Sequence, residues 1–293
     1  MKKIKNHLRD ILRIFLGKKL YTHIRFFITH KYFLNIKNPK TFSEKIIHRK
    51  FNADPLYLSQ FTDKYVVREY VKTRIGNEYL IPLYKEREKI IPLDFIDLPN
   101  EFVIKTSNGG GGENILIVRD KKSLDIDRIC NEFNSYIDIK IGAKIDELFY
   151  DVQKPKILFE KLIKDEQDKV PSDFKFHVFN NGYESNIFIQ VDIGRFEKHK
   201  RTIYNSDKTP SYFKIQPKYE EIGEDFVFPD NYPQMLCLVN KLASDFTYVR
   251  VDMYSCNNNI YFGEMTFCHG SGWEPIRPLA VDYELGQYWN EKK

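Results

Sequence analysis

Val249-Arg250-Val251-Asp252-Met253-Tyr254 and Tyr261-Phe262-Gly263-Glu264-Met265-Thr266 are the two segments from which the architecture of this chain can be inferred. Apolar and polar side chains alternate along both segments, as they do in strands that bury one face. The polar stretch Asn257-Asn258-Asn259 separates them. The pattern therefore predicts an antiparallel hairpin.

The expected hairpin brings two acidic side chains together. If its turn is centred on Asn258, Asp252 lies directly opposite Glu264 and Arg250 lies opposite Thr266, all on one face. Like charges directly opposite each other across an antiparallel pair are destabilising, and a divalent metal bound by oxygen ligands is the natural group to compensate them. A one-residue bulge would break this register, and two solvated acids on an exposed face are the alternative interpretation.

A glycine-rich stretch is the second candidate site. A predicted strand ends at Lys105, and its loop leads to another predicted strand near residues 114–118. Glycines let backbone amides approach a phosphate closely, and the lysine would supply a positive charge. A Walker-type loop or a dinucleotide fingerprint would need a helix after the glycines, so we expect a hairpin that closes over a nucleotide or, alternatively, a flexible loop. The glycines are Gly109, Gly110, Gly111 and Gly112.

Three weaker candidates lie elsewhere in the chain. Lys175 shares one face of a predicted strand with Asp173 and His177. The segment Glu160-Lys161-Leu162 ends an apolar strand, where free backbone groups could meet an adenine edge. A later basic stretch could receive an anionic substrate or could simply be solvated, and it contains Arg195, His199 and Arg201.

Positive charge gathers at the N-terminal end. The chain has 293 residues, is 42% hydrophobic and 30% charged, and should fold rather than remain disordered. Its formal charge is +5. Residues 1–31 carry nine Lys/Arg against one acid, Asp10, which argues against a general nucleic-acid-binding surface and for a local attraction to something anionic. Apolar residues recur at helical spacing in this segment and predict a basic amphipathic helix; they are Ile4, Leu8, Ile11, Leu12 and Phe15. Such a helix could bind a membrane surface or an acidic glycan. The alternative is a helix that docks on the protein while its lysines face water.

Several helices are expected between these sites. Thr41 and Glu44 have capping-box spacing, and a second helix start is predicted at Thr62. Residues 125–140 and 233–244 are also expected to be helical.

We expect a cytoplasmic protein, with peripheral contact at the inner face of the membrane as a further expectation. No apolar run approaches the roughly 20 residues that span a bilayer, and no secretory cleavage pattern is visible. The cysteines are scattered and should be reduced thiols, and Cys268 beside His269 is not expected to be a nucleophile and its base. They are Cys130, Cys237, Cys256 and Cys268.

Taken in order, several sequence blocks resemble the TupA-like ATP-grasp family. They are Asn38-Pro39-Lys40-Thr41-Phe42-Ser43-Glu44-Lys45, Thr62-Asp63-Lys64-Tyr65-Val66-Val67-Arg68-Glu69-Tyr70, Phe102-Val103-Ile104-Lys105-Thr106 with its glycines, Asp173-Phe174-Lys175-Phe176, and the two hairpin segments. The resemblance implies an α+β, ATP-grasp fold in which two α+β lobes sandwich ATP. It divides the chain into a basic helical extension (1–35), a pre-grasp region (36–98), a small lobe with the glycine-rich hairpin (99–163) and a C-terminal lobe with the metal-binding hairpin (164–293).

The resemblance also implies roles for individual residues. ATP would be bound by Lys105, Gly109 to Gly112, Glu160, Lys161, Leu162 and Lys175. The metal ligands would be Asp252, Glu264 and Thr266, of which Thr266 stands where many ATP-grasp enzymes have Asn. Arg201 and Arg250 would stabilise the transferred phosphate or the substrate carboxylate. Apart from the resemblance, we expect Arg195, His199 and His269 to contact the substrate. Lys64 belongs to the sequence signature without an assigned contact.

The implied reaction is an ATP-dependent ligation with Mg²⁺, expected as two ions. ATP would phosphorylate a carboxylate, and an amine would attack the acyl phosphate to form an amide. The family is associated with teichuronopeptide and capsular polysaccharide synthesis, so the expected partners are a carbohydrate carboxylate, such as a uronic acid, and a small amine or amino acid, with no nucleic acid. A glycosyltransferase using Asp125-Ile126-Asp127 and a non-catalytic nucleotide- or glycan-binding module are the alternatives.

Overall fold

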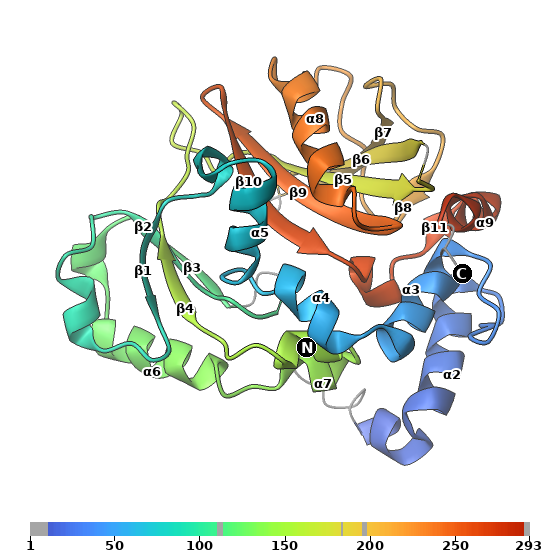
Figure 1. Cartoon of the computed structure of the whole chain (residues 1–293), viewed down its shortest axis with the longest axis horizontal. Coiled ribbons are helices and arrows are strands. Elements are labelled where there is room, and N and C mark those ends of the chain that lie inside the picture. The colour runs from blue at the N-terminus through green and yellow to red at the C-terminus, as the bar shows by residue number, and fades with distance from the viewer. Residues whose placement is uncertain (1–10, 110–113, 183, 195–197, 290–293) are drawn as a thin grey trace.

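The computed structural model describes residues 11–109, 114–182, 184–194 and 198–289. Most of its strands belong to two antiparallel sheets that lie in separate lobes (Figure 1). The small sheet has the order β1-β4-β2-β3, with β1 (Leu83–Arg87), β2 (Phe102–Thr106), β3 (Ile115–Val118) and β4 (Ile157–Glu160). The large sheet has the order β10-β9-β5-β6-β7, with β5 (Asp173–Asn180), β6 (Ser185–Ile193), β7 (Lys200–Asn205), β9 (Tyr248–Cys256) and β10 (Asn259–Thr266). A two-stranded sheet pairs β8 (Lys214–Ile215) with β11 (Ile276–Arg277).

Helices cover both lobes. The α-helices are α2 (Lys18–His30), α3 (Phe42–Asn52), α4 (Pro55–Thr62), α5 (Val67–Arg74), α6 (Ile126–Tyr136), α7 (Ile141–Ile145), α8 (Tyr232–Ala243) and α9 (Leu279–Tyr288), and residues 11–16 are also helical. The 3₁₀ turns are η1 (Asn77–Tyr79), η2 (Pro92–Phe95), η3 (Lys121–Ser123), η4 (Leu148–Asp151) and η5 (His269–Gly272). Within the described ranges, none of the helices is long and apolar enough to cross a membrane.

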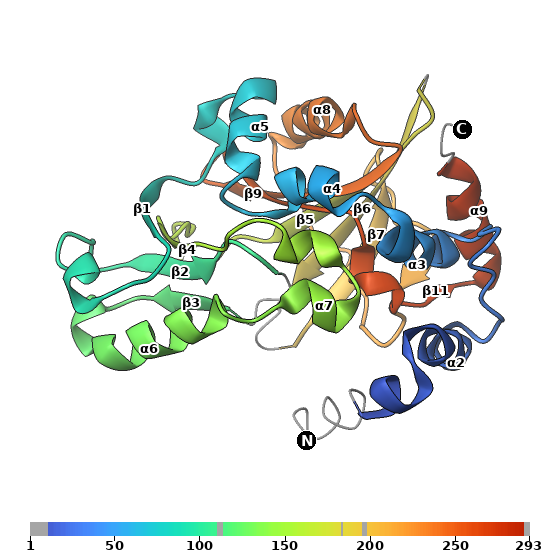
Figure 2. The same ribbon diagram turned by 60° about the horizontal axis from the view of Figure 1, so that its bottom comes forward.

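In the small lobe, α6 packs on one face of the sheet (Figure 2). Its apolar stripe, which includes Ile129 and Phe133, joins the core formed by alternating residues of β2 such as Phe102. The helix predicted over residues 125–140 is confirmed, although it ends at Tyr136. The strand β1 precedes residue 99 and still pairs with β4, so the small sheet draws on sequence from the region expected to precede the lobe.

In the large lobe, α8 packs against β5 and β9. The residues of β5 that point toward this layer are apolar, and Phe176 is fully buried in the same core as Met235. The opposite face of β5 carries Asp173, Lys175 and His177. The alternation predicts a half-buried sheet, but these polar residues are buried as well. Lys175 forms ion pairs with Asp173 and Asp252, and His177 lies 3.1 Å from the hydroxyl of Tyr248 on β9.

The hairpin of β9 and β10 pairs the predicted residues through a different turn. Asn257 and Asn258 have φ angles of 49° and 61°, which fit a two-residue type I′ turn rather than one centred on Asn258. The strands are then offset by one residue until the register shifts at Gly263. A Cβ atom there would lie 3.1 Å from the Asp252 carbonyl oxygen, so glycine suits the close approach. Beyond this bulge the pairs are Glu264 with Asp252, Met265 with Val251, and Thr266 with Arg250.

The helices before β1 begin at different signals. The capping box predicted at α3 is confirmed, because Thr41 and Glu44 satisfy each other's backbone amides. The helix start predicted at Thr62 is wrong: α4 ends there. The side chain of Asp63 instead accepts hydrogen bonds from the next turn, which leads into α5.

Candidate active site

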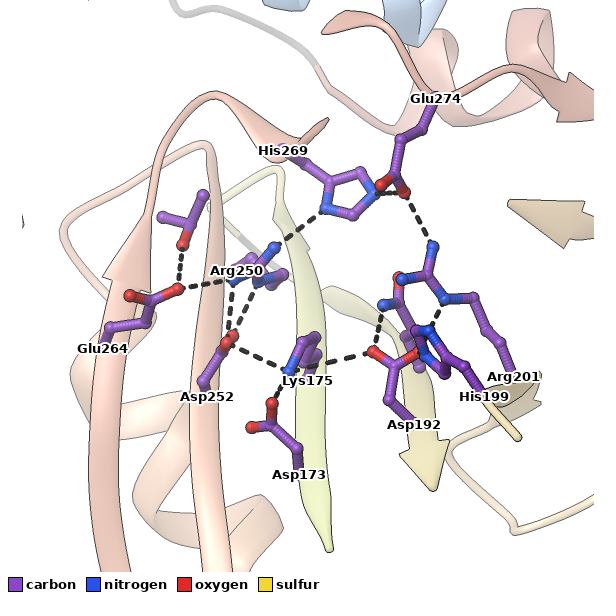
Figure 3. Close-up of polar contacts among 12 residues, drawn as sticks. Asp173, Lys175, Asp192, His199, Arg201, Arg250, Asp252, Glu264, His269 and Glu274 are labelled. Carbon is purple, nitrogen blue, oxygen red and sulfur yellow. Dashed lines mark hydrogen bonds and ion pairs between the residues drawn. The ribbon is translucent and has the colours of Figure 1, made fainter. Parts of the chain in front are cut away.

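The polar face of the large sheet holds a buried charge network (Figure 3). Lys175 on β5 forms an ion pair with Asp173 and lies 3.4 Å from Asp252 and 3.8 Å from Asp192. The strand register explains this arrangement, because Lys175 is the Cα partner of Asp252 on β9. One lysine therefore faces carboxylates from three strands.

Arg250 joins the two acids of the hairpin. Its Nε donates to Oδ1 of Asp252 at 2.6 Å, and its Nη2 lies 2.8 Å from Oδ2 of Asp252 and 2.8 Å from Oε1 of Glu264. Burial acts to lower the pKa of Arg250, but Asp252 and Glu264 raise it above its ordinary value. The compensation expected for the paired acids is thus supplied, in this structure, by a guanidinium whose forked geometry matches carboxylates.

The two hairpin acids have different environments. Burial raises the pKa of Asp252 above its ordinary value, although Arg250 and Lys175 act in the opposite direction. Burial also acts to raise the pKa of Glu264, but Arg250 and then Lys64 outweigh it and the pKa is lowered. Glu264 is also about one-third exposed at its side chain, so the pair combines a fully enclosed acid with one that reaches the surface.

A second cluster lies beside the first and centres on Asp192. This acid accepts hydrogen bonds from Nε of Arg201 at 2.7 Å and from Gln190 at 2.7 Å, and it lies 2.8 Å from His199. Arg201 also donates to Glu274 at 2.7 Å. Burial acts to raise the pKa of Asp192, but Arg201 and other cationic and hydrogen-bonding neighbours hold it well below its usual range.

His269 connects the two clusters. Its Nδ1 lies 3.0 Å from Nη1 of Arg250, and its Nε2 lies 3.2 Å from Glu274. Since a guanidinium can only donate, Nδ1 must accept, and the neutral ring carries its proton on Nε2 toward Glu274. Burial lowers the pKa of His269, which favours this neutral form. The predicted residues Arg201, His199 and His269 therefore share one network with Arg250.

Asp192 and Glu274 escaped the sequence analysis. Asp192 did carry a signal, because it alternates with Gln190 on a strand whose other face is apolar. Glu274 lies after η5, where no periodic pattern marks a buried acid.

The small lobe contributes a second group of charges. Lys105 on β2 lies 2.5 Å from Glu160 at the end of β4, and Arg68 on α5 lies 3.6 Å from the same acid. Leu162, just after β4, is buried. Lys105, the predicted phosphate ligand, therefore contacts Glu160, the first residue of the predicted adenine segment.

The loop after β2 is held by the junction between α4 and α5. Lys64 donates a hydrogen bond from Nζ to the carbonyl oxygen of Gly109, and its backbone N–H donates to Ser107 at 2.8 Å. The hydroxyl of Ser107 donates to Asp63 at 2.6 Å. Burial lowers the pKa of Lys64, whereas Glu264 is the largest influence that raises it, which places Lys64 within the electrostatic reach of the hairpin. The structure thus gives Lys64 a contact, with the Gly109 carbonyl, that could not be inferred from the sequence. Gly110, Gly111, Gly112 and Arg195 lie outside the described residues.

The predicted adenine segment requires one correction. The backbone N–H of Lys161 donates to the carbonyl oxygen of Pro82 at 2.9 Å, so it is not free to meet a base edge. The physical reason is the neighbouring strand β1, which pairs with β4 and extends its contact beyond the strand end. A cavity of about 450 Å³ lies beside this segment and the hairpin tip, and its lining includes Lys161, Leu162, Tyr84, Asn257 and Tyr261.

The acidic residues of the β9–β10 hairpin fit a magnesium ion that takes only a few of its ligands from the protein. In the part of the chain that the structure describes, no group of three or more His, Cys, Asp or Glu side chains could hold a metal. Mg²⁺ commonly binds through one or two carboxylates together with phosphate oxygens of a substrate and water. Asp252 and Glu264 would be such a pair, and the hydroxyl of Thr266 lies 3.2 Å from Oε1 of Glu264.

Two alternative sites have structural roles instead. Asp125 caps α6 by accepting a hydrogen bond from the backbone N–H of Arg128 at 3.0 Å, as expected of a helix start rather than a metal ligand. Cys268 lies beyond the end of β10, is buried, and burial raises the pKa of its thiol, which disfavours a thiolate nucleophile.

A protein-family model described as TupA-like ATPgrasp matches residues 44–290. The match covers most of the chain, so the resemblance inferred from the sequence is confirmed, and with it the α+β ATP-grasp fold class. A search of curated proteins found no match.

Solved structures that resemble this chain include three ligases. D-alanine–D-alanine ligase from Helicobacter pylori has 16% identity and a TM-score of 0.43 over 79% of this chain and 62% of that chain. L-amino acid ligase from Bacillus licheniformis has 14% identity and a TM-score of 0.46 over 74% and 45%. Phosphoribosylamine–glycine ligase from Thermotoga maritima has 13% identity and a TM-score of 0.40 over 72% and 48%. The present chain thus spans between 45% and 62% of the length of these proteins.

Proposed function

The chain belongs to the TupA-like ATP-grasp family, and from this premise we propose that it is an ADP-forming carboxylate–amine ligase. The observation that carries the proposal is the pairing of Asp252 with Glu264 across the hairpin, with Arg250 and Lys175 against them. Phosphoryl transfer depends on positioning and on offsetting charge, and this cluster offers both without a protein nucleophile.

In the proposed reaction, a carboxylate oxygen of the acceptor attacks the γ-phosphorus of ATP and the bond to the β-phosphate oxygen breaks, releasing ADP. An amine nitrogen then attacks the acyl carbon, loses a proton, and displaces inorganic phosphate. Lys105, Lys175 and the loop from Gly109 to Gly112 would hold the phosphates, and the segment Glu160 to Leu162 would border the adenine.

Asp252, Glu264 and Thr266 would hold Mg²⁺, expected as two ions, and the metal would supply positive charge against the phosphates. Arg250 orients both carboxylates, and Arg201 would face the transferred phosphate or the acceptor carboxylate. Asp192 and Glu274 fix the guanidinium of Arg201 from two sides, at 2.7 Å each. Arg195, His199 and His269 would contact the substrate.

We further propose that the acceptor is a uronic acid of a bacterial capsular or surface polysaccharide and that the amine is small or an amino acid. The family's association with surface polysaccharides supports this choice. We also propose that the protein works in the cytoplasm, since all four cysteines are free thiols.

The test is ADP release by the purified protein with ATP and Mg²⁺ across a panel of uronic acids and amines. We expect release that requires both a carboxylate and an amine, and that the variant Asp252→Asn abolishes. The matched control, Asp125→Asn, should keep full activity, because Asp125 only caps α6. If ATP binds and no ADP forms with any pair, the chain is a non-catalytic nucleotide-binding module. If Asp125→Asn rather than Asp252→Asn stops the reaction, a glycosyltransferase gains support.

A further inference from the structure

The helix α2 has an apolar face that points away from the protein. Its buried side consists of Thr22, Phe26 and His30. Successive residues of a helix are turned by about 100°, so a residue two positions before or after Thr22 lies on the opposite side, together with its neighbours three and four positions along. Those positions hold exposed apolar side chains, namely Leu20, Ile24, Phe27 and Ile28. A surface helix normally has the reverse pattern, with its polar face outward.

The apolar surface continues on both sides of this helix. Phe33 is 82% exposed and stacks on Phe27 with ring centroids 4.8 Å apart. In the helical residues before α2, Ile14 and Phe15 are 83% and 86% exposed. Of the 23 large hydrophobic residues that are exposed in the described ranges, nine lie between residues 11 and 33. Such a concentration marks a contact surface rather than scattered apolar residues.

The charges that this segment itself carries beside the apolar face are all positive, and Asp146 from α7's C-terminal end lies 3.5 Å from one of them, Lys18. From residue 11 to residue 43 the sequence contains seven Lys/Arg and no acid. Lys18, Lys19 and Lys31 are exposed beside the apolar residues. Two other cations fasten the segment to the body: Arg13 pairs with Asp146, and Arg25 lies 4.0 Å from the ring centre of Trp273. The helix lies at the edge of the molecule in both ribbon views (Figures 1 and 2), so its outer face is presented at the surface.

We propose that α2 and the helical residues 11–16 lie in the plane of an anionic lipid bilayer. Exposed Phe, Ile and Leu side chains would enter the boundary between headgroups and acyl chains, and the flanking lysines would contact anionic headgroups. A second copy of the chain fits less well, because two identical faces would bring their positive charges together. An acidic glycan would satisfy the lysines but would leave the apolar face exposed to water.

The experiment is co-sedimentation of the full chain with lipid vesicles at low salt. We expect binding to phosphatidylcholine vesicles that contain about one-third phosphatidylglycerol, and much weaker binding to phosphatidylcholine alone. The triple variant Ile24→Ser, Phe27→Ser and Ile28→Ser should weaken binding by about tenfold or more. The control is Leu56→Ser with Val227→Ser, which removes apolar side chains elsewhere that are even more exposed, and it should bind like the unaltered protein.

A charge variant separates the two contributions. Replacing Lys18, Lys19 and Lys31 by Gln should weaken binding to anionic vesicles by roughly fivefold per lysine and remove the preference for anionic lipid. The proposal is overturned if the unaltered protein binds neither kind of vesicle, if it binds both equally, or if the control variant loses as much binding as the triple variant. It is also overturned if the unaltered protein is a dimer that the triple variant dissociates while vesicle binding stays unchanged. Because the readout is lipid binding, its result is independent of ligase activity.

Discussion

The variant Arg250→Met tests whether one guanidinium neutralises the paired acids of the hairpin. In the structure it makes three contacts of 2.6 to 2.8 Å with Asp252 and Glu264, and all are buried or partly buried. Removing one partner of a buried ion pair costs about 3–5 kcal/mol of unfolding free energy. We expect a loss of this size near pH 8, measured by urea denaturation. The control Arg74→Met removes a partly exposed pair with Asp245 and should cost about 0–1 kcal/mol.

The pH dependence of that loss distinguishes charge from packing. Arg250 lowers the pKa of both hairpin acids, so both pKa values rise when it is removed. The folded variant then binds protons that the unfolded chain does not, and its deficit shrinks as the pH falls. Each acid recovers up to about 1.4 kcal/mol per pH unit within the window between its unfolded and folded pKa values. An equal loss at pH 8 and pH 5.5, or a loss no larger than that of Arg74→Met, would refute this reasoning.

Three further predictions concern other parts of the fold. Burial lowers the pKa of His30 to about 4, so the unfolded chain binds a proton at this residue more readily than the folded one. The free energy of unfolding should therefore fall by about 3 kcal/mol as the pH drops from above 6.5 toward 4. Thermal unfolding of His30→Gln should lack this dependence on pH. Asn258→Val places a β-branched residue at a φ of 61° and should destabilise the hairpin by about 1–2 kcal/mol in urea titrations, whereas the same change at Asn259 should cost less. Lys64→Met removes the donor to the Gly109 carbonyl and should raise the KM for ATP about tenfold with a smaller effect on kcat, a result that equal losses in both constants would contradict.

The β9–β10 hairpin shows how much of the site can be predicted from the local sequence pattern. Alternation and two acids predict that Asp252 faces Glu264, and the structure agrees. The predicted turn centre, Asn258, differs from the observed two-residue turn of Asn257 and Asn258, because a two-residue turn followed by a bulge gives the same pairing of Asp252 with Glu264. Gly263 carried the missing signal, since an isolated glycine within a strand often marks a bulge. The bulge at Gly263 brings Glu264 opposite Asp252 instead of breaking their pairing.

The partners of the charged residues could not be predicted from local pattern. Arg201 and Asp192 come from adjacent strands, and Glu274 comes from a segment about 70 residues further along the chain, so their contacts depend on tertiary packing. The same limit applies to β1, whose sequence Leu83-Tyr84-Lys85-Glu86-Arg87 has little apolar alternation and becomes a strand by pairing with β4. It also applies to Lys64, whose contact with Gly109 joins two distant segments.

Calorimetric titration of ATP with and without Mg²⁺ tests the proposed nucleotide site most directly. For the unaltered protein, Mg²⁺ should strengthen ATP binding, because Asp252 and Glu264 would share the ion with the phosphates. Asp252→Asn should abolish this gain and weaken Mg²⁺-dependent binding by about 100-fold, or about 2.7 kcal/mol, while Asp125→Asn should bind as the unaltered protein does. An Asp252→Asn variant that keeps the full Mg²⁺-dependent affinity would contradict the assignment of this hairpin as the metal and nucleotide site.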